Sequence, residues 1–225
     1  KQGGLFVFSS VGSAREAKVA ADAGADVIVA QGWEAGGHVW GQVTTMALVP
    51  AVVDEVDVPV VAAGGISDGR AMAAALMLGA SGVWVGTRFL ASHEATIHPE
   101  YRQRIIEASE DQTYWAKELY NGFWPNAPHR ALVNKTSTNW EAAGRPDPGR
   151  RPGENEPVGQ KVNGEPVLRY EAHTPATNTT GNIADMSLWS GQGVSQVRKL
   201  QSAAEIVEEI YSEAKLTIQA FQQRA

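Results

Sequence analysis

Short apolar runs alternate with segments of helical spacing over the first ninety residues. Runs typical of strands occupy residues 5–11, 27–30, 58–63 and 82–86. The segments between them that favour helices are residues 14–23, 44–56 and 68–79. Strands that are apolar at nearly every position and alternate with helices are typical of a parallel sheet covered on its faces. The pattern therefore predicts an α/β fold built from consecutive βα units.

The ends of the predicted helices carry local signals. Ser13 and Glu16 have the spacing of a capping box, and Gly24 follows that helix as a left-handed cap. Ser202 and Glu205 repeat the capping box before a C-terminal helix, whose apolar face is expected to hold Ile206, Val207, Ile210 and Ala214. SAREAKVAADAGADVIVAQG and DGRAMAAALMLGASGVWVGT also align helix on helix and strand on strand. This internal repeat predicts a (β/α) barrel or a doubly wound sheet.

The pattern changes after Ser92. Residues 98–122 have helical spacing and are predicted to form a helix, whereas residues 124–183 are rich in Pro, Gly, Asn and Thr without periodicity. So long a stretch is either a functional excursion over an active site or a mobile segment. We expect three parts: C-terminal βα units of a barrel, a small helical and loop-rich second domain or lid, and a return to the barrel with a C-terminal helix. Their ranges are 1–95, 96–183 and 184–225.

Composition narrows the class of function. The chain has 225 residues, 43% of them hydrophobic, and a formal net charge of −6. No block of Lys or Arg forms a basic stripe, so neither nucleic acid nor an anionic membrane is expected as a partner. Cysteine is absent, which excludes disulfides, thiolate nucleophiles and Cys-ligated metals. With no membrane-length apolar run and no visible signal peptide, a soluble cytoplasmic protein is expected.

Glycines collect where three of the predicted strands end. The strands end in VIVAQG at Gly32, in VVAAGG at Gly65 and in VWVGT at Thr87. In parallel α/β folds the carboxyl ends of the strands meet at one site. Gly64 and Gly65, with Gly86 and Thr87 one unit later, would place bare backbone N–H groups side by side, and such groups bind phosphate. A tight turn explains one such pair equally well, but two consecutive units match the phosphate site of (β/α) barrels.

One histidine stands among four glycines in QGWEAGGHVWGQ, residues 31–42. An imidazole accepts a proton near neutral pH without special tuning, so His38 is a candidate general base. Trp33 and Trp40 flank it, and we interpret them as core or rim packing ahead of substrate stacking. Glu34 either orients His38 or faces water. The loop of residues 190–193 either closes over a cofactor or simply begins a helix.

The other histidines carry weaker signals. His93 and His98 bracket Glu94, but no matching ligand cluster accompanies them, so no metal site is expected. His129 and His173 lie in polar stretches and are interpreted as solvated loop residues.

Nitronate monooxygenases, formerly called 2-nitropropane dioxygenases, resemble this chain over residues 5–95 and 183–211. The resemblance is carried by ADVIVAQGWEAGGH, LVPAVVDEVDVPVVAAGGISDGRAMAAALMLGASGVWVGTRFLAS and SGQGVSQVRKLQSAAEIVEEI. PHRALVNKT, residues 128–136, is similar to a segment of that family's small second domain. The resemblance implies FMN held at the mouth of a TIM barrel and the oxidation of alkyl nitronates with O₂.

The resemblance also implies roles for individual residues. The FMN phosphate would be held by Gly64, Gly65, Gly86 and Thr87. The flavin would be approached by Gln31, Gly32, Gly36 and Gly37, with His38 as the catalytic base. No GxGxxG fingerprint follows a strand, which favours FMN over a pyrophosphate-bearing cofactor. HVWGQ stands where many members have HRG, a departure next to the expected substrate.

Two alternative functions stay open. Flavin-dependent enoyl-acyl carrier protein reductases share GGH, TTMALVP and AAGGI with this chain. One alternative is therefore an FMN-dependent NAD(P)H reductase of a quinone or an enoyl-acyl carrier protein. The other is a non-catalytic (β/α) binding module.

The resemblance implies a position within the barrel as well. The recognisable strands correspond to the fifth to eighth of a TIM (β/α)8 barrel, so the chain is expected to cover about its C-terminal half, plus the small second domain. Half a barrel exposes two strand edges and an apolar interior. The N-terminal half is therefore expected from a longer protein or a separate chain. The residues expected to lack part of their packing shell are Val27, Val29, Val60, Val61 and Val83.

Overall fold

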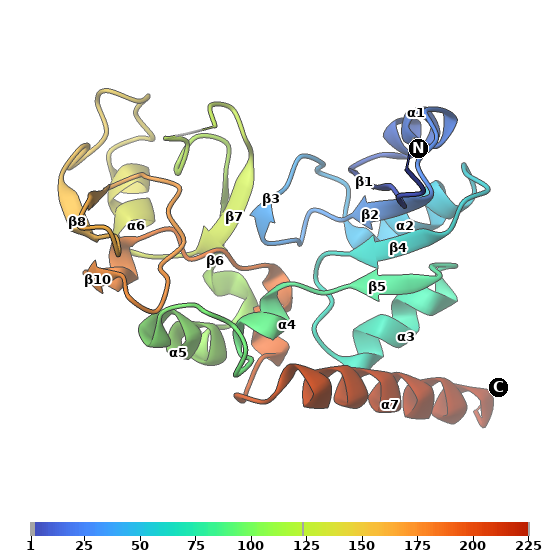
Figure 1. The fold of residues 1–225 in the computed structure, drawn as a ribbon. Coiled ribbons are helices and arrows are strands. Elements are labelled where there is room, and N and C mark those ends of the chain that lie inside the picture. Colours follow the sequence, from blue (N-terminus) through green and yellow to red (C-terminus); the bar gives the residue numbers. More distant parts are fainter. Residues whose placement is uncertain (1–2, 123, 225) are drawn as a thin grey trace.

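The computed structural model describes residues 3–122 and 124–224, and its N-terminal part is a parallel sheet of four strands (Figure 1). The strands are β1 (Phe8–Val11), β2 (Val27–Gln31), β4 (Val60–Ala63) and β5 (Gly82–Trp84). They lie in the order β1-β2-β4-β5, and each neighbouring pair runs parallel. The predicted α/β class is confirmed.

Helices connect these strands. They are α1 (Ala14–Asp22), α2 (Thr45–Val53), α3 (Gly69–Met77) and α4 (Thr87–Leu90), the last of which follows β5. The side chains of α2 and the inner strands form a continuous apolar core that includes Ile28, Ala30, Leu48, Val49, Val52 and Ala62. Two helix starts have side-chain caps, because Ser13 accepts from the Glu16 N–H at 3.2 Å and Asp68 accepts from the Ala71 N–H at 2.8 Å. The Glu16 carboxylate reaches the Gly12 N–H instead of that of Ser13.

The C-terminal helix α7 (Ala203–Gln222) returns to the first part of the chain and packs against α3 (Figure 1). A Cβ atom on Gly69 would lie 2.4 Å from the backbone nitrogen of Ala214, so only glycine permits this close approach. The predicted capping box at Ser202 is confirmed. The apolar face predicted for α7 is buried except for Val207. Val207 is exposed because it lies beside the row of buried residues Ile206, Ile210 and Ala214 on the helix.

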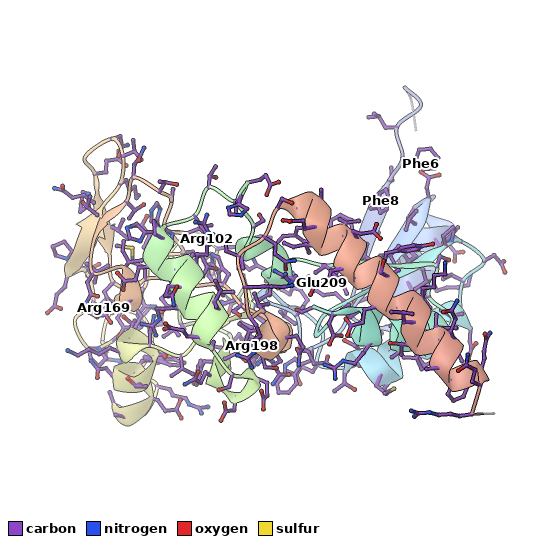
Figure 2. All side chains as sticks on the ribbon, turned by 90° about the horizontal axis from the view of Figure 1, so that it is seen from below. Phe6, Phe8, Arg102, Arg169, Arg198 and Glu209 are labelled. Carbon is purple, nitrogen blue, oxygen red and sulfur yellow. The ribbon has the colours of Figure 1, made fainter. Side chains whose placement is uncertain are left out.

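The parallel sheet is strongly curved. β1 and β5 are its two outer strands, yet the rings of Phe8 and Trp84 lie with centroids 5.9 Å apart. Curvature that brings opposite edges together is what closure into a barrel requires. Phe8 is 51% exposed and Trp84 is 54% exposed, and Phe6 is also open to solvent at the β1 end of the sheet (Figure 2).

The open apolar surface differs from the one that the sequence predicts. Val29 and Val60 are buried, although both were expected to lack part of their packing shell. Val60 belongs to the apolar core that the sheet forms with α2. Val27, Val61 and Val83 are half-buried. On the outer strands themselves, the exposed large apolar side chains are the aromatic Phe8 and Trp84. No described strand pairs with the outer edge of β1 or of β5.

The second part begins with α5 (Pro99–Glu107), which ends well before the predicted residue 122. A capping box between Ser109 and Gln112 forms the short 3-10 turn η1 (Glu110–Gln112), and β6 (Thr113–Ala116) follows. The prediction of helix over this stretch is wrong after Glu107. Thr, Tyr and Trp favour strands, and here their pairing with another strand outweighs the helical spacing.

Regular elements also occupy the stretch that lacks periodicity in sequence. They are β7 (His129–Leu132), α6 (Lys135–Ala142), β8 (Pro157–Gln160), β9 (Pro166–Leu168), β10 (Thr180–Gly181) and the 3-10 turn η2 (Ile183–Asp185). Arg151 forms an ion pair with Glu154 and stacks on Tyr170, with its guanidinium carbon 4.4 Å from the ring centroid. The two expected domain boundaries stay a prediction.

A second sheet joins the two parts. β3 (Gly37–His38) runs antiparallel to β7, which runs antiparallel to β6. His38 is thereby the direct cross-strand neighbour of His129. The loop that carries the predicted base is thus held by the second part of the chain (Figure 1). No helix in the described part of the chain has the length and apolar character needed to cross a bilayer.

Candidate functional site

A cavity of about 550 Å³ lies at the carboxyl ends of β2, β4 and β5. This volume is in the range of ligand sites in proteins, roughly 300–1,000 Å³. All but Gly32 of the nine residues predicted for the site line the cavity, namely Gln31, Gly36, Gly37, His38, Gly64, Gly65, Gly86 and Thr87. The convergence of strand ends predicted from sequence therefore holds in space.

The glycines after β4 form a cradle of bare backbone in the wall of the cavity. Gly64 and Gly65 have φ values of +102° and +73°, in the region that favours glycine. A Cβ atom on Gly193 would lie 2.9 Å from the Gly65 carbonyl oxygen, so the loop of residues 190–193 meets this turn without room for a side chain. Outside the helices and strands, no hydrogen bond between backbone groups of the described residues has the N–H of Gly65, Gly86 or Thr87 as its donor. Free donors of this kind suit an anionic group.

Gly32 has a different place from the other predicted glycines. A Cβ atom on it would lie 2.0 Å from the Thr45 hydroxyl, so it allows the start of α2 to pack against the strand end. The Glu34 carboxylate accepts from the Thr45 N–H at 2.9 Å and therefore caps α2. Both interpretations offered for Glu34, orientation of His38 and exposure to water, are replaced by this structural role.

The loop of residues 190–193 closes one side of the cavity and also leads into the short 3-10 turn η3 (Gln192–Gln196). The Gly191 N–H donates to the Thr87 hydroxyl at 2.9 Å, and the Gln192 N–H donates to the Glu34 carbonyl at 2.9 Å. A Cβ atom on Gly36 would lie 2.4 Å from the Gly191 nitrogen. Gly36 is therefore required for the contact between this loop and the His38 loop.

His38 is held on β3 and surrounded by aromatic rings. The Gln31 amide donates to the His38 carbonyl at 3.0 Å, which fixes the backbone of His38 to the end of β2. The His38 ring centroid lies 4.7 Å from that of Trp124 and 6.0 Å from that of Trp189. Burial by these rings lowers the pKa of His38 below its ordinary value of 6.5. The imidazole is thereby kept neutral at neutral pH, as a base requires.

His129 is fully buried, so its interpretation as a solvated loop residue is wrong. It lies on β7, where its Nε2 accepts from the Tyr120 N–H at 3.1 Å and its Nδ1 lies 2.9 Å from the Ala127 carbonyl oxygen. Burial lowers the pKa of His129 to about 4. The signal that could have found it is the run HRAL, a strand-length segment bounded by Pro128 and Asn134.

Trp33 and Trp40 fit the packing interpretation. The Trp33 ring lies 4.8 Å from the guanidinium carbon of Arg130, and the buried Arg130 Nη2 donates to the Trp33 carbonyl at 3.0 Å. Trp40 is exposed and meets the Trp124 ring edge to face, with centroids 6.0 Å apart. Arg130 was not singled out by the sequence, although it fastens the beginning of the His38 loop.

Several further residues that the sequence did not assign to the site individually also line the cavity. They are Ile66, Ser67, Trp84, Leu90, Ala172, Thr174, Trp189, Gly191 and Gly193. The Trp189 indole donates to the Thr174 hydroxyl at 2.8 Å, so part of the non-periodic stretch contributes to the wall. The lining contains no Lys, Arg, Asp or Glu. His38 is consequently the group in this lining that is suited to proton transfer near neutral pH.

The described residues contain no cluster of His, Asp and Glu that could hold a metal ion. His98 caps α5, because its Nδ1 accepts from the Glu100 N–H at 3.1 Å. Glu94 caps α7 by accepting from the Ala203 N–H at 2.9 Å. These contacts give Glu94 and His98 structural roles.

Comparison with known proteins identifies similar chains. A family model described as nitronate monooxygenase matches residues 1–213. The probable nitronate monooxygenase of Bacillus subtilis is 32% identical, over 95% of this chain and 58% of its own length. The nitronate monooxygenase of Neurospora crassa is 35% identical, over 97% and 56%. A (3aS,4S,5R,7aS)-5-hydroxy-7a-methyl-1-oxo-octahydro-1H-indene-4-carboxyl-CoA dehydrogenase of Rhodococcus jostii is 41% identical, over 64% and 39%.

Solved structures share the fold. FabK of Thermotoga maritima has a TM-score of 0.73 and 29% identity, with 100% of this chain and 65% of that chain covered. The nitroalkane oxidase of Streptomyces ansochromogenes has a TM-score of 0.73 and 24% identity, with 98% and 60% covered. Both neighbours are TIM-barrel enzymes of the α/β class. The chain spans about half the length of the curated relatives that it matches.

Proposed function

Because this chain belongs to the nitronate monooxygenase family, we propose that it acts as an FMN-dependent oxidoreductase that oxidises alkyl nitronates with O₂. The observation that carries the proposal is a single cavity that combines a glycine cradle with one neutral imidazole. The cradle suits a phosphate, and the imidazole suits proton abstraction. His38 is the proposed general base.

The residues present fit FMN. The N–H groups of Gly65, Gly86 and Thr87 would donate hydrogen bonds to its phosphate. The turn beside the phosphate is built from Gly64 and Gly65, whose positive φ values favour glycine. Gln31, Gly36 and Gly37 line the cavity toward His38 and would contact the ring. When bound, FMN supplies a two-electron acceptor beside the substrate.

His38 would take the α-proton of a neutral nitroalkane at an imidazole nitrogen. This transfer requires the uncharged ring, which burial between Trp124 and Trp189 favours. The same rings cover part of the imidazole. A substrate that arrives already ionised as its nitronate needs no such step.

A second reaction at the same site is supported by one observation. FabK of Thermotoga maritima aligns with the whole of this chain at 29% identity. The second candidate is therefore an NAD(P)H-dependent reductase of a quinone or an enoyl thioester. A non-catalytic module is the third candidate, and it would carry no flavin.

Purified full-length protein is expected to be yellow, with FMN as the cofactor released on denaturation. Under anaerobic conditions, an alkyl nitronate is expected to bleach the flavin absorbance within the enzyme's turnover time, and NADH is expected to bleach it far more slowly. Stopped-flow absorbance with each reductant in turn measures both rates. Fast bleaching by NADH alone would establish the reductase, and a colourless protein that takes up no added FMN would establish the non-catalytic module.

We also propose that further strands complete the curved sheet, as the resemblance to the C-terminal half of a barrel implies. The support is the unpaired outer edges of β1 and β5 and the exposed Phe6, Phe8 and Trp84 between them. Residues 1–225 alone are then expected to associate or to retain FMN poorly, because open aromatic surface and free strand edges promote association. Light scattering and flavin content measure this. A monomer of residues 1–225 that retains FMN and melts in one sharp transition would disprove it.

A further inference from the structure

The two ring nitrogens of His129 are both engaged by backbone groups of one short segment. Nε2 accepts from the Tyr120 N–H, and Nδ1 lies at hydrogen-bond distance from the Ala127 carbonyl. A carbonyl only accepts, so Nδ1 carries the proton and the ring is neutral. Tyr120 and Ala127 are themselves buried. The imidazole therefore ties the backbone at Tyr120 to the backbone at Ala127, the two ends of a segment of which the structure describes every residue except 123.

That segment carries Trp124 to His38. The Trp124 ring is half exposed, and its centroid lies 4.7 Å from that of His38 and 6.0 Å from that of Trp40. The ends of the segment are fixed, because the Tyr120 hydroxyl bonds Asn134 at one end and the His129 ring bonds both ends. Trp124 itself has no recorded side-chain hydrogen bond among the described residues, so its place on His38 depends on how the segment is held.

His129 cannot relay a proton to His38 in this arrangement. The two rings are cross-strand neighbours with centroids 6.4 Å apart, and both nitrogens of His129 are occupied by the backbone. No ion pair of the described residues includes either imidazole. The aromatic rings beside His38 in the described part of the chain include those of Trp124, Trp189 and His129 itself.

We propose that His129 is a positioning residue: its imidazole clasps the ends of the segment from Tyr120 to Ala127 and so keeps the Trp124 indole on His38. The access of water to His38 is then set by a buried residue that does not itself line the cavity. The effect of this cover on turnover rests on the proposed function of His38 as the general base. The clasp itself is a property of this chain and is testable without turnover.

The test is the titration of the His38 ring, followed by NMR in full-length protein labelled at histidine. Loss of one signal in His38→Asn assigns it. His129→Phe keeps the ring shape but removes both hydrogen bonds, and Trp124→Ala removes the covering indole. Each is expected to move the His38 midpoint upward, toward its ordinary value of 6.5, because water then reaches the charged ring. The double variant is expected to move it no further, since both changes remove the same cover.

Two further variants separate positioning from general damage. His129→Gln can still accept from one backbone group and donate to the other, so it is expected to restore most of the native midpoint. His173→Gln removes a half-buried histidine elsewhere and is expected to leave His38 unchanged. In active enzyme, the acid limb of kcat/KM for neutral nitroalkanes is expected to follow the NMR midpoint in every variant.

An unchanged His38 midpoint in folded His129→Phe would overturn the proposal. It would also be overturned if the shift of this midpoint in the double variant equalled the sum of the shifts in His129→Phe and Trp124→Ala. If His129→Phe does not fold, Trp124→Ala and His129→Gln decide: an unmoved midpoint in the first, or a fully shifted one in the second, overturns the proposal. Loss of the proposed function gives a different result. A protein without nitronate turnover whose His38 midpoint responds as expected would retain the clasp and refute only the assigned reaction.

Discussion

Replacing His38 with asparagine is expected to lower the turnover of neutral nitroalkanes by roughly 10²–10⁴-fold, the usual contribution of a positioned general base. FMN is expected to stay bound, because the proposed phosphate cradle belongs to Gly65, Gly86 and Thr87. Oxygen consumption with a neutral nitroalkane and with its pre-ionised nitronate measures the effect. Activity on the pre-ionised substrate is expected to fall far less, since it requires no proton abstraction.

The pH dependence supplies a second readout of the same residue. Burial lowers the pKa of His38, so the neutral base persists below the ordinary value of 6.5 and is lost as pH falls through the lowered value. For neutral nitroalkanes, kcat/KM is therefore expected to have an acid limb below pH 6.5. For pre-ionised nitronates that limb is expected to be absent. Wild-type rates on neutral nitroalkanes in His38→Asn would rule His38 out as the base.

The predicted parts of the site are those with local or topological causes. Gly64, Gly65, Gly86 and Thr87 follow parallel strands, and the carboxyl ends of such strands must converge. Helix ends were predicted for a similar reason, because a capping box such as Ser202 and Glu205 is complete within four residues. Signals of this kind need no knowledge of the rest of the fold.

The missed parts depend on contacts between distant segments. His129 is buried because β7 pairs with β3 and β6, and no local pattern encodes a pairing between residues 38 and 129. The helix predicted over β6 is wrong for the same reason, since the pairing of this segment with β7 outweighs its helical spacing. The wall formed by Thr174 and Trp189 joins a residue of the stretch without periodicity to one that follows this stretch. Long-range pairing, more than composition, decides which side chains surround His38.

Replacing Gly65 with valine is expected to abolish FMN retention. Its φ of +73° is strained for any side chain and most for a β-branched one, at a cost of roughly 1–3 kcal/mol. A Cβ atom there would also lie 3.2 Å from the Glu34 Cβ, so the added methyl groups must take space in or beside the cradle. If FMN binding requires the turn to keep this strained conformation, the strain alone corresponds to about a 5–150-fold loss in FMN affinity.

The flavin absorbance of purified protein and its titration with added FMN measure the loss. Gly82→Val is the matched control, because Gly82 begins β5, has no positive φ and has nothing within 4 Å of its Cβ position. Valine favours strands, so this control is expected to keep both flavin and stability. Urea unfolding of the apo forms separates a damaged cradle from a damaged fold. If Gly65→Val binds FMN as tightly as the Gly82 control, the turn after β4 does not hold the phosphate, and the free N–H groups of Gly86 and Thr87 would have to hold it alone.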